Sequence, residues 1–174
     1  MKPDVIVVGG GPAGMMAGLL LARSGIPVLV VEKHGDFLRD FRGDTVHPST
    51  MEILDQLGML DRFLKRPHSR LSQARITVAG RNLTIGELRH LNTPTPFIAM
   101  MPQWDFLDFL KTEASRFPSF ALEMNAEVVE LIERDGRTVG VVLAGGRCIE
   151  AGKLVIMADG RGSIVRGQNI LPVK

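Results

Sequence analysis

The sequence predicts an α/β fold built on a central parallel β-sheet. The first observation is a set of four apolar runs of strand length, near residues 5, 28, 121 and 155. The second is a glycine-rich turn that joins the first run to a helical stretch ending at Ser24. The third is a series of alternating segments joined at Asp135-Gly136 and Gly145-Gly146, which predicts a three-stranded antiparallel meander.

The glycine-rich turn has the pattern G-x-G-x-x-G between a strand and a helix. In this pattern the first glycine allows a tight turn, the second lets the backbone approach a pyrophosphate, and the third lets the helix pack on the strand. The N–H groups at the helix start and the helix macrodipole would hold that anion. The residues expected to bind a dinucleotide here are Gly9, Gly11, Pro12, Ala13 and Gly14.

A carboxylate follows the second apolar run at the distance expected of a ribose ligand. Glu32 lies 18 residues after Gly14 and ends the run Val28 to Val31. Because it would repel a 2′-phosphate, FAD or NAD is favoured over NADP. The competing interpretation is a glycine-rich loop with a chance carboxylate after it. Lys33 begins the charged loop beside the nucleotide, and we include it among the binding residues.

Composition narrows the class of protein. The 174 residues are 45% apolar, enough for one main domain, and the net charge of +2 is too small to indicate a nucleic acid partner. The basic run from 62 to 75 is interpreted as a solvated face. The single cysteine, Cys148, rules out an intrachain disulfide, which favours a reducing cytosol. Without an apolar run of the ~20 residues that span a bilayer or a signal peptide pattern, we expect a cytoplasmic protein and no integral membrane segment.

The middle of the chain predicts short elements. Ser49 to Glu52 reads as a capping box for a helix that Gly58 ends, and another helical turn follows from Leu60 to Arg66. Three short strands are expected, at Ala74 to Ala79, Asn82 to Ile85 and Phe97 to Met101.

The second half predicts a helix and the remaining strands. The helix begins at Pro102 and runs to about Arg116, with a core stripe of Phe106, Leu107, Leu110 and Ala114. Phe120 to Met124 is expected to be a buried strand. Leu154 to Ala158 is the last strand, followed by Asp159 to Ser163 and a helix with Val165 and Arg166.

Four ordered motifs together are more specific than the glycine pattern alone. They are Gly9 to Gly14 with Glu32, Arg42 to Pro48, Pro102 to Leu107, and Ala158 to Arg161. With these motifs the sequence resembles the single-component flavoprotein aromatic hydroxylases, monooxygenases of the para-hydroxybenzoate hydroxylase type, from Met1 to about Pro172. The resemblance implies a Rossmann-like FAD-binding fold. It also implies FAD as cofactor, NAD(P)H as co-substrate, and dioxygen and an aromatic molecule as substrates.

The resemblance also assigns roles to single residues. Glu32 would bind the FAD adenosine ribose, Arg42 the ribityl–pyrophosphate region, and Gln103 the cofactor chain. Asp159-Gly160 matches a motif tied to the FAD and NAD(P)H sites, and the backbone of Val128 or Val129 would contact adenine. Each residue also has a structural interpretation. Arg42 would be a surface arginine, Gln103 an ordinary helix cap and Asp159 the cap of a plain turn. Val128 and Val129 would simply pack in a strand.

The resemblance implies that the cofactor carries the chemistry. NAD(P)H would reduce the flavin, dioxygen would form a flavin hydroperoxide, and its terminal oxygen would pass to the aromatic ring. We therefore expect no catalytic side chain or metal ligand in this chain. His47, before a proline at a helix entrance, is interpreted as structural, and Met15 and Met16 as helix packing.

The resemblance implies an incomplete domain. The later Gly-Asp motif of the family and the body of its substrate domain have no counterpart, so 1–174 is interpreted as a truncated FAD-binding domain, with 66–101 a partial substrate-domain-like insertion. Such a fragment is expected to be inactive alone and to self-associate through an unpaired sheet edge at the Leu154 strand or its neighbour. The alternatives are a non-catalytic nucleotide-binding module, a halogenase or reductase of the same superfamily, and an NAD-dependent dehydrogenase.

Overall fold

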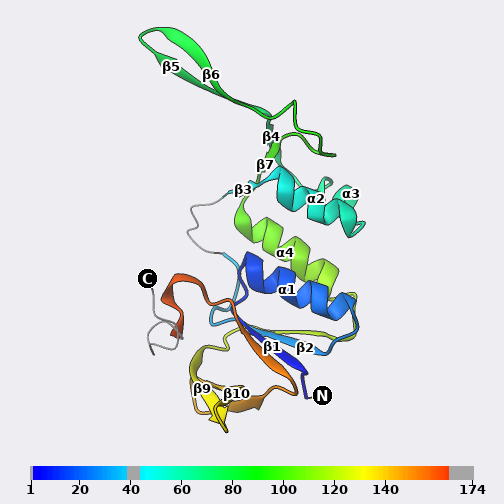
Figure 1. Ribbon diagram of the computed structural model, residues 1–174, viewed down its shortest axis with the longest axis vertical. Coiled ribbons are helices and arrows are strands. Elements are labelled where there is room, and N and C mark those ends of the chain that lie inside the picture. Colours follow the sequence, from blue (N-terminus) through cyan, green and yellow to red (C-terminus); the bar gives the residue numbers. More distant parts are fainter. Residues whose placement is uncertain (1, 39–43, 165–174) are drawn as a thin grey trace. The chain divides into compact units, whose positions relative to one another are not determined.

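The computed structural model describes residues 2–38 and 44–164 (Figure 1). The chain divides into two compact units, one made of residues 1–38 and 107–174 and the other of residues 39–106. Val165 and Arg166, expected in a last helix, lie outside the described residues. Within the described residues no helix is both long and apolar enough to cross a bilayer.

The first unit contains the predicted parallel sheet. Its strands are ordered β12 (Leu154–Met157), β1 (Val5–Val8), β2 (Val28–Val31) and β8 (Phe120–Glu123), and all neighbours are parallel. The sequence of β1 is entirely apolar because both faces of that strand are covered, as parallel sheets require. The four apolar runs therefore form one sheet, as predicted.

Different layers cover the two faces of this sheet. Helix α1 (Pro12–Arg23) packs on β1 and β2 and buries Met15, Leu19 and Ala22. The other face carries the meander of β9 (Val128–Arg134), β10 (Arg137–Leu143) and β11 (Cys148–Glu150), which confirms the antiparallel prediction. One core cluster joins the sheet to the meander and includes Ile6, Val8, Val31, Val128, Val141 and Leu143. Figure 1 shows α1 and the β9–β10 pair on opposite sides of β1 and β2.

The strand predicted at Phe120 to Met124 forms β8, but the prediction that it is buried is wrong. No residue of β8 is buried, because β8 ends the sheet and, within the described residues, pairs only with β2. The ring of Phe120 still lies under α1, where a Cβ on Gly18 would come within 3.1 Å of it. At the opposite end, β12 pairs only with β1 among the described strands, so the predicted open edge is present there.

Helix α4 (Gln103–Ala114) begins in the second unit and continues in the first. The predicted stripe of Phe106, Leu107, Leu110 and Ala114 is buried, and the helix ends two residues before Arg116. Glu113 is buried on the same helix, with its carboxylate 3.2 Å from a guanidinium nitrogen of Arg116.

The second unit combines short helices with antiparallel strands. A three-stranded sheet has the order β3 (Thr45–Val46), β7 (Ile98–Met100) and β4 (Ser69–Leu71), and only β7 was predicted. Helices α2 (Pro48–Gln56) and α3 (Leu60–Phe63) contribute Met51, Leu54 and Phe63 to the core. Phe63 meets Phe106 edge to face, with ring centroids 5.9 Å apart.

The predicted capping box before α2 is wrong. The helix begins one residue earlier, with His47 as N-cap and Pro48 in the first turn, and no side chain makes a cap hydrogen bond. Proline has no N–H to satisfy and its φ is already helical, so it favours the first helical position and leaves Ser49 inside the helix. The predicted end is correct, since Gly58 follows the last turn with φ +69°.

A two-stranded hairpin extends from this unit (Figure 1). Its strand β5 (Gln73–Val78) begins and ends one residue before the predicted strand, β6 (Arg81–Glu87) is longer than predicted, and the two pair antiparallel. Ala79 and Gly80 form the turn, both with positive φ, which is typical of two-residue hairpin turns. The hairpin lies inside the range 66–101, whose interpretation as a substrate-domain-like insertion stays a prediction.

Candidate functional site at the carboxyl ends of β1, β2 and β12

The glycine-rich loop begins where β1 ends, and two of its glycines are required by close packing. Gly9 has φ +106°, and a Cβ there would overlap the carbonyl of Ala158. A Cβ on Gly14 would overlap the carbonyl of Gly9, so helix α1 can approach the loop only without that atom. Gly11, at the N-cap of α1, has no atom within 4 Å of the position a Cβ would take. A Cβ on Gly10 would come within 2.9 Å of the Glu32 Cβ, so the loop is tight at Gly9, Gly10 and Gly14 and open at Gly11.

Glu32 fastens this loop to the end of β2. Glu32 is only 3% exposed, and one carboxylate oxygen accepts the backbone N–H of Gly10 at 2.7 Å. The other accepts the backbone N–H of His34 at 3.0 Å. A carboxylate offers about four acceptor positions, so one such group can in general serve backbone and ligand donors together. The Gly10 contact was not predicted, although a carboxylate ending the strand beside a glycine loop is a signal for it.

The Asp159-Gly160 turn lies beside the same loop. It follows β12, which is held to β1 by the hydrogen bond from Ala158 N–H to the Val8 carbonyl at 2.7 Å. Gly160 opens a 3₁₀ turn, η1 (Gly160–Gly162), with φ +76°. The Asp159 carboxylate accepts the backbone N–H of Ile164 at 3.0 Å, which orders the turn locally. The sequence thus correctly predicts both the glycine turn and the Asp-Gly turn, and the structure brings them together.

These three features meet at one edge of a parallel sheet. Strand β1 lies between β2 and β12, so the chain after β1 crosses to β2 on one side, whereas β12 joins the sheet on the other side. Such a switch in strand order is where open α/β sheets bind their ligands, outside the carboxyl ends of the strands. With the N-terminus of α1 also at this edge, the geometry suits an anionic dinucleotide.

Residues 2–173 match the family described as "FAD binding domain". The chain belongs to this family. It is 36% identical over 165 residues to 6-methylpretetramide 4-monooxygenase of Streptomyces rimosus, an alignment that covers 94% of this chain and 40% of the relative.

Solved structures share the fold of this FAD binding domain. One is p-nitrophenol 4-monooxygenase of Pseudomonas putida, with a TM-score of 0.81 and 25% identity over 99% of this chain and 45% of that one. Another is the flavin-dependent monooxygenase PieE in complex with FAD and substrate, with a TM-score of 0.79 and 26% identity over 100% of this chain and 33% of that one. The chain therefore spans less than half the length of each of these three relatives.

The other residues predicted to bind the cofactor in this FAD binding domain are described by their exposure and packing. Lys33 and Ala13 are exposed, and Pro12 is half-buried in the first turn of α1. The side chain of Val128 packs in the core cluster whereas Val129 is 49% exposed, so packing accounts for the Val128 side chain. Contact of either backbone with adenine stays a prediction. Met15 is fully buried, which confirms the packing interpretation for that residue.

Gln103 is the first residue of α4, and its side chain has a buried polar atom without a partner. Its Oε1 atom is buried and has no hydrogen-bond partner. A buried acceptor left unpaired costs about 1–3 kcal/mol, so a donor is expected to reach it. A hydrogen bond from the cofactor chain to Gln103, and the alternative of an ordinary helix cap, both stay predictions. Arg42, the other residue predicted to contact this part of the cofactor, lies outside the described residues.

Two further functional predictions concern His47 and metals. His47 is exposed and occupies the N-cap position of α2, in agreement with a structural interpretation. Within residues 2–38 and 44–164 no cluster of three or more histidine, cysteine or acidic side chains could hold a metal ion.

Proposed function

We propose that this FAD binding domain is the cofactor-binding part of an NAD(P)H-dependent monooxygenase that hydroxylates an aromatic substrate. Family membership supports FAD, and the relatives compared above are monooxygenases, one of which is named for p-nitrophenol. The net reaction would insert one oxygen atom of O₂ into an aromatic C–H bond. NAD(P)H and a proton would supply the two electrons and two hydrogens that reduce the other oxygen atom to water.

The observation that carries this proposal is the convergence of Gly9, Glu32 and Asp159 at the carboxyl ends of neighbouring strands. In the proposed complex the N-terminal N–H groups of α1 bind the pyrophosphate of FAD, and the open position at Gly11 admits it closely. Glu32 accepts the ribose hydroxyls while continuing to hold Gly10. Gln103 Oε1 accepts a donor from the cofactor chain.

The proposal assigns binding and orientation to the protein. FAD, when bound, supplies the redox chemistry with NAD(P)H and dioxygen that amino-acid side chains lack. The residues named here would fix the adenosine and pyrophosphate, so that the flavin ring is held at a constant distance from its reactants. No side chain of the described residues is assigned a proton transfer.

Flavin titration tests the cofactor assignment. The purified chain is titrated into FAD and into NAD while flavin fluorescence and bound nucleotide are measured. We expect saturable binding of FAD, with NAD bound far more weakly. Tight NAD binding without FAD binding would make the site that of a nicotinamide dehydrogenase.

A second assay tests the reaction class with FAD-loaded protein that includes any sequence encoded downstream, because residues 1–174 are expected to be inactive alone. NADH and NADPH oxidation is followed with a set of phenols, with and without oxygen, and products are separated by mass. Hydroxylated product that depends on oxygen supports the proposal. A halogenated product in the presence of halide, or a reduced product without oxygen, would place the protein among the other oxidoreductases of the superfamily.

A further inference from the structure

The turn between β8 and β9 holds the backbone at and just after Glu32. Asn125 N–H donates to the His34 carbonyl at 3.0 Å, and Ala126 N–H donates to the Glu32 carbonyl at 2.8 Å. The N–H of Glu32 itself donates to the Glu123 carbonyl at 2.9 Å, which extends the pairing of β2 with β8. These backbone bonds fix the stretch of chain from which the Glu32 side chain projects.

Asn125 has the backbone conformation that this hold requires. Successive N–H groups of an extended chain point in opposite directions, so two consecutive N–H groups can bind one neighbouring segment only where the chain bends. Asn125 supplies the bend with φ +56°, in the left-handed region that asparagine and glycine adopt more readily than other residues. Ala126 is buried in the core cluster of sheet and meander, so the turn is anchored on a packed surface.

The carboxylate of Glu32 depends on the same stretch of chain. It accepts the N–H of Gly10 at 2.7 Å and the N–H of His34 at 3.0 Å. His34 is therefore held at both of its backbone groups, its N–H by Glu32 and its carbonyl by Asn125. A shift of the turn at Asn125 would move His34 and with it the carboxylate that faces the glycine loop.

We propose that Asn125 is a positioning residue for cofactor binding, whose left-handed backbone directs the Glu32 carboxylate toward Gly10 and the ribose of FAD. This inference rests on the proposed function, in which Glu32 accepts the ribose hydroxyls. Asn125 acts through the backbone of residues 32–34 and touches no part of the cofactor. Binding groups must be held within about 0.5 Å of their productive position, so a small shift of this turn is enough to weaken binding.

The side chain of Asn125 can be tested separately from its backbone. A Cβ on Gly35 would come within 2.9 Å of Asn125 Oδ1, the end of an exposed side chain. Gly35→Ala should therefore displace the amide of Asn125 and leave the backbone of the turn in place. We expect this variant to bind FAD as the parent does.

Substitutions at position 125 test the backbone conformation. Asn125→Gly accepts a positive φ without steric conflict and should keep the Kd for FAD within about twofold of the parent. Asn125→Val is β-branched and disfavours this conformation, so it should raise the Kd about fivefold or more. Asn125→Ala strains the same backbone less and replaces the valine variant if that variant does not fold, with a smaller loss in the same direction. Far-UV circular dichroism confirms that each variant is folded.

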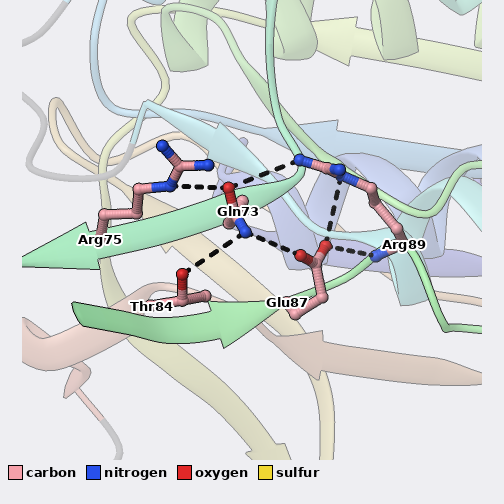
Figure 2. Close-up of polar contacts among 5 residues, drawn as sticks. All are labelled: Gln73, Arg75, Thr84, Glu87 and Arg89. Atoms are coloured by element: carbon pink, nitrogen blue, oxygen red, sulfur yellow. Dashed lines mark hydrogen bonds and ion pairs between the residues drawn. The ribbon is translucent and has the colours of Figure 1, made fainter. Parts of the chain in front are cut away.

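Two other left-handed residues provide matched controls. Asp135, with φ +53°, lies in the β9–β10 turn, and Ala79, with φ +49°, lies in the β5–β6 turn. The strands beside Ala79 are held by side-chain bonds of their own, since Figure 2 shows Gln73 accepting Arg75 Nε at 2.8 Å and donating to Glu87 at 2.9 Å. Asp135→Val and Ala79→Val strain the backbone in the same way as Asn125→Val and should leave the Kd for FAD unchanged.

The amide proton of Gly10 reports the position of the carboxylate in the full chain without any ligand. A short hydrogen bond to a carboxylate moves an amide proton downfield, so Glu32→Ala should move the Gly10 signal upfield in proton–nitrogen NMR spectra. Asn125→Val should move it in the same direction, whereas Asn125→Gly, Gly35→Ala and Asp135→Val should not. An unmoved Gly10 signal in folded Asn125→Val would overturn the proposal.

FAD titration in two backgrounds completes the test. The loss caused by Asn125→Val should disappear in Glu32→Ala, because no carboxylate is left to position. An equal loss in both backgrounds, or the same loss in Asp135→Val, would overturn the proposal, and so would a loss in Gly35→Ala as large as in Asn125→Val. Absence of FAD binding by the parent chain would overturn the proposed function instead, and the Gly10 signal would still decide whether Asn125 positions Glu32.

Discussion

The fold requires some glycines of the loop and not others. At Gly9 and Gly14 the protein itself leaves no room for a side chain, since a Cβ would overlap a neighbouring carbonyl. At Gly11 the protein leaves the space open and φ is −72°, which any residue adopts. If FAD binds here as proposed, the missing side chain at Gly11 would let its pyrophosphate approach the backbone closely.

This difference predicts opposite phenotypes for two alanine variants. Gly14→Ala should destabilise the protein by about 1–3 kcal/mol or more, because overpacking forces α1 away from the loop. Gly11→Ala should cost less than about 1 kcal/mol of stability, the scale of an N-cap change, yet weaken FAD binding at least about tenfold. Urea denaturation and FAD titration of both variants check this. Normal FAD affinity in Gly11→Ala would show that the pyrophosphate does not lie over this residue.

Glu32 combines a structural and a proposed binding role, and two variants separate them. Glu32→Ala removes the acceptor of the Gly10 and His34 N–H groups and should lower both stability and FAD affinity, the latter by about 1–3 kcal/mol. Glu32→Gln keeps one amide oxygen and the side-chain size, so it should recover part of both. Unchanged FAD affinity in folded Glu32→Ala would remove this carboxylate from the site.

At the scale of elements, sequence patterns predict the strands with strong signals. The runs that became β1, β2 and β12 are continuous and apolar, and the meander has alternation with turn residues, so the parallel sheet and its covering layer follow from the sequence. Strand β3 has two residues and β4 begins with Ser69-Arg70, so neither carries a pattern. They exist because β7 between them supplies backbone partners, which is tertiary information.

The candidate site likewise has features that the sequence predicts and features that only the folded chain shows. Gly9, Gly14 and Glu32 are predicted by spacing because local chain geometry sets their positions. The bond between Gly10 and Glu32 joins residues 22 apart in sequence, and the approach of Ala158 to Gly9 joins β12 to β1, so neither can be read from one segment. The buried, unpaired Oε1 of Gln103 is likewise visible only once the helix is packed.

The start of α2 offers a test of its corrected N-terminus. If His47 is the N-cap, Ser49→Ala removes no cap and should change stability by less than about 0.5 kcal/mol. His47→Asp should stabilise the helix by about 0.5–2 kcal/mol, because its carboxylate can accept an N–H group of the first turn. Thermal denaturation measures both. A loss of about 1 kcal/mol or more in Ser49→Ala would restore the capping box.

The meander contributes a pH-dependent interaction. Hydrogen bonds from Lys2 and Arg134 to Glu150, at 3.1 and 2.9 Å, hold the pKa of that carboxyl below its usual range. A lowered pKa in the folded state stabilises the protein above the pKa of the unfolded chain and ceases to do so as pH falls through the folded value. Glu150→Gln should therefore be slightly less stable than the parent at pH 7 and equal to it at pH 2. The difference at pH 7 should shrink in 1 M salt, because these groups are exposed.

At the scale of the whole molecule, the predicted binding residues fall in both compact units. The glycine loop, Glu32 and Asp159 belong to the first, and Gln103 belongs to the second. The hairpin of the second unit contains none of them.

Hydrogen exchange can locate the cofactor without relying on activity. A ligand that binds only the folded state stabilises it by about 2.7 kcal/mol at a free concentration 100 times its Kd. Amides of β1 and β2 that exchange only when the first unit opens should therefore slow about 100-fold in FAD, and Gly10 to Gly14 should gain protection directly. Amides of residues 73–87 should exchange at the same rate with and without FAD at concentrations where the chain is monomeric. Protection that appears in the hairpin while the glycine loop exchanges unchanged would mean that FAD binds away from the carboxyl ends of β1, β2 and β12.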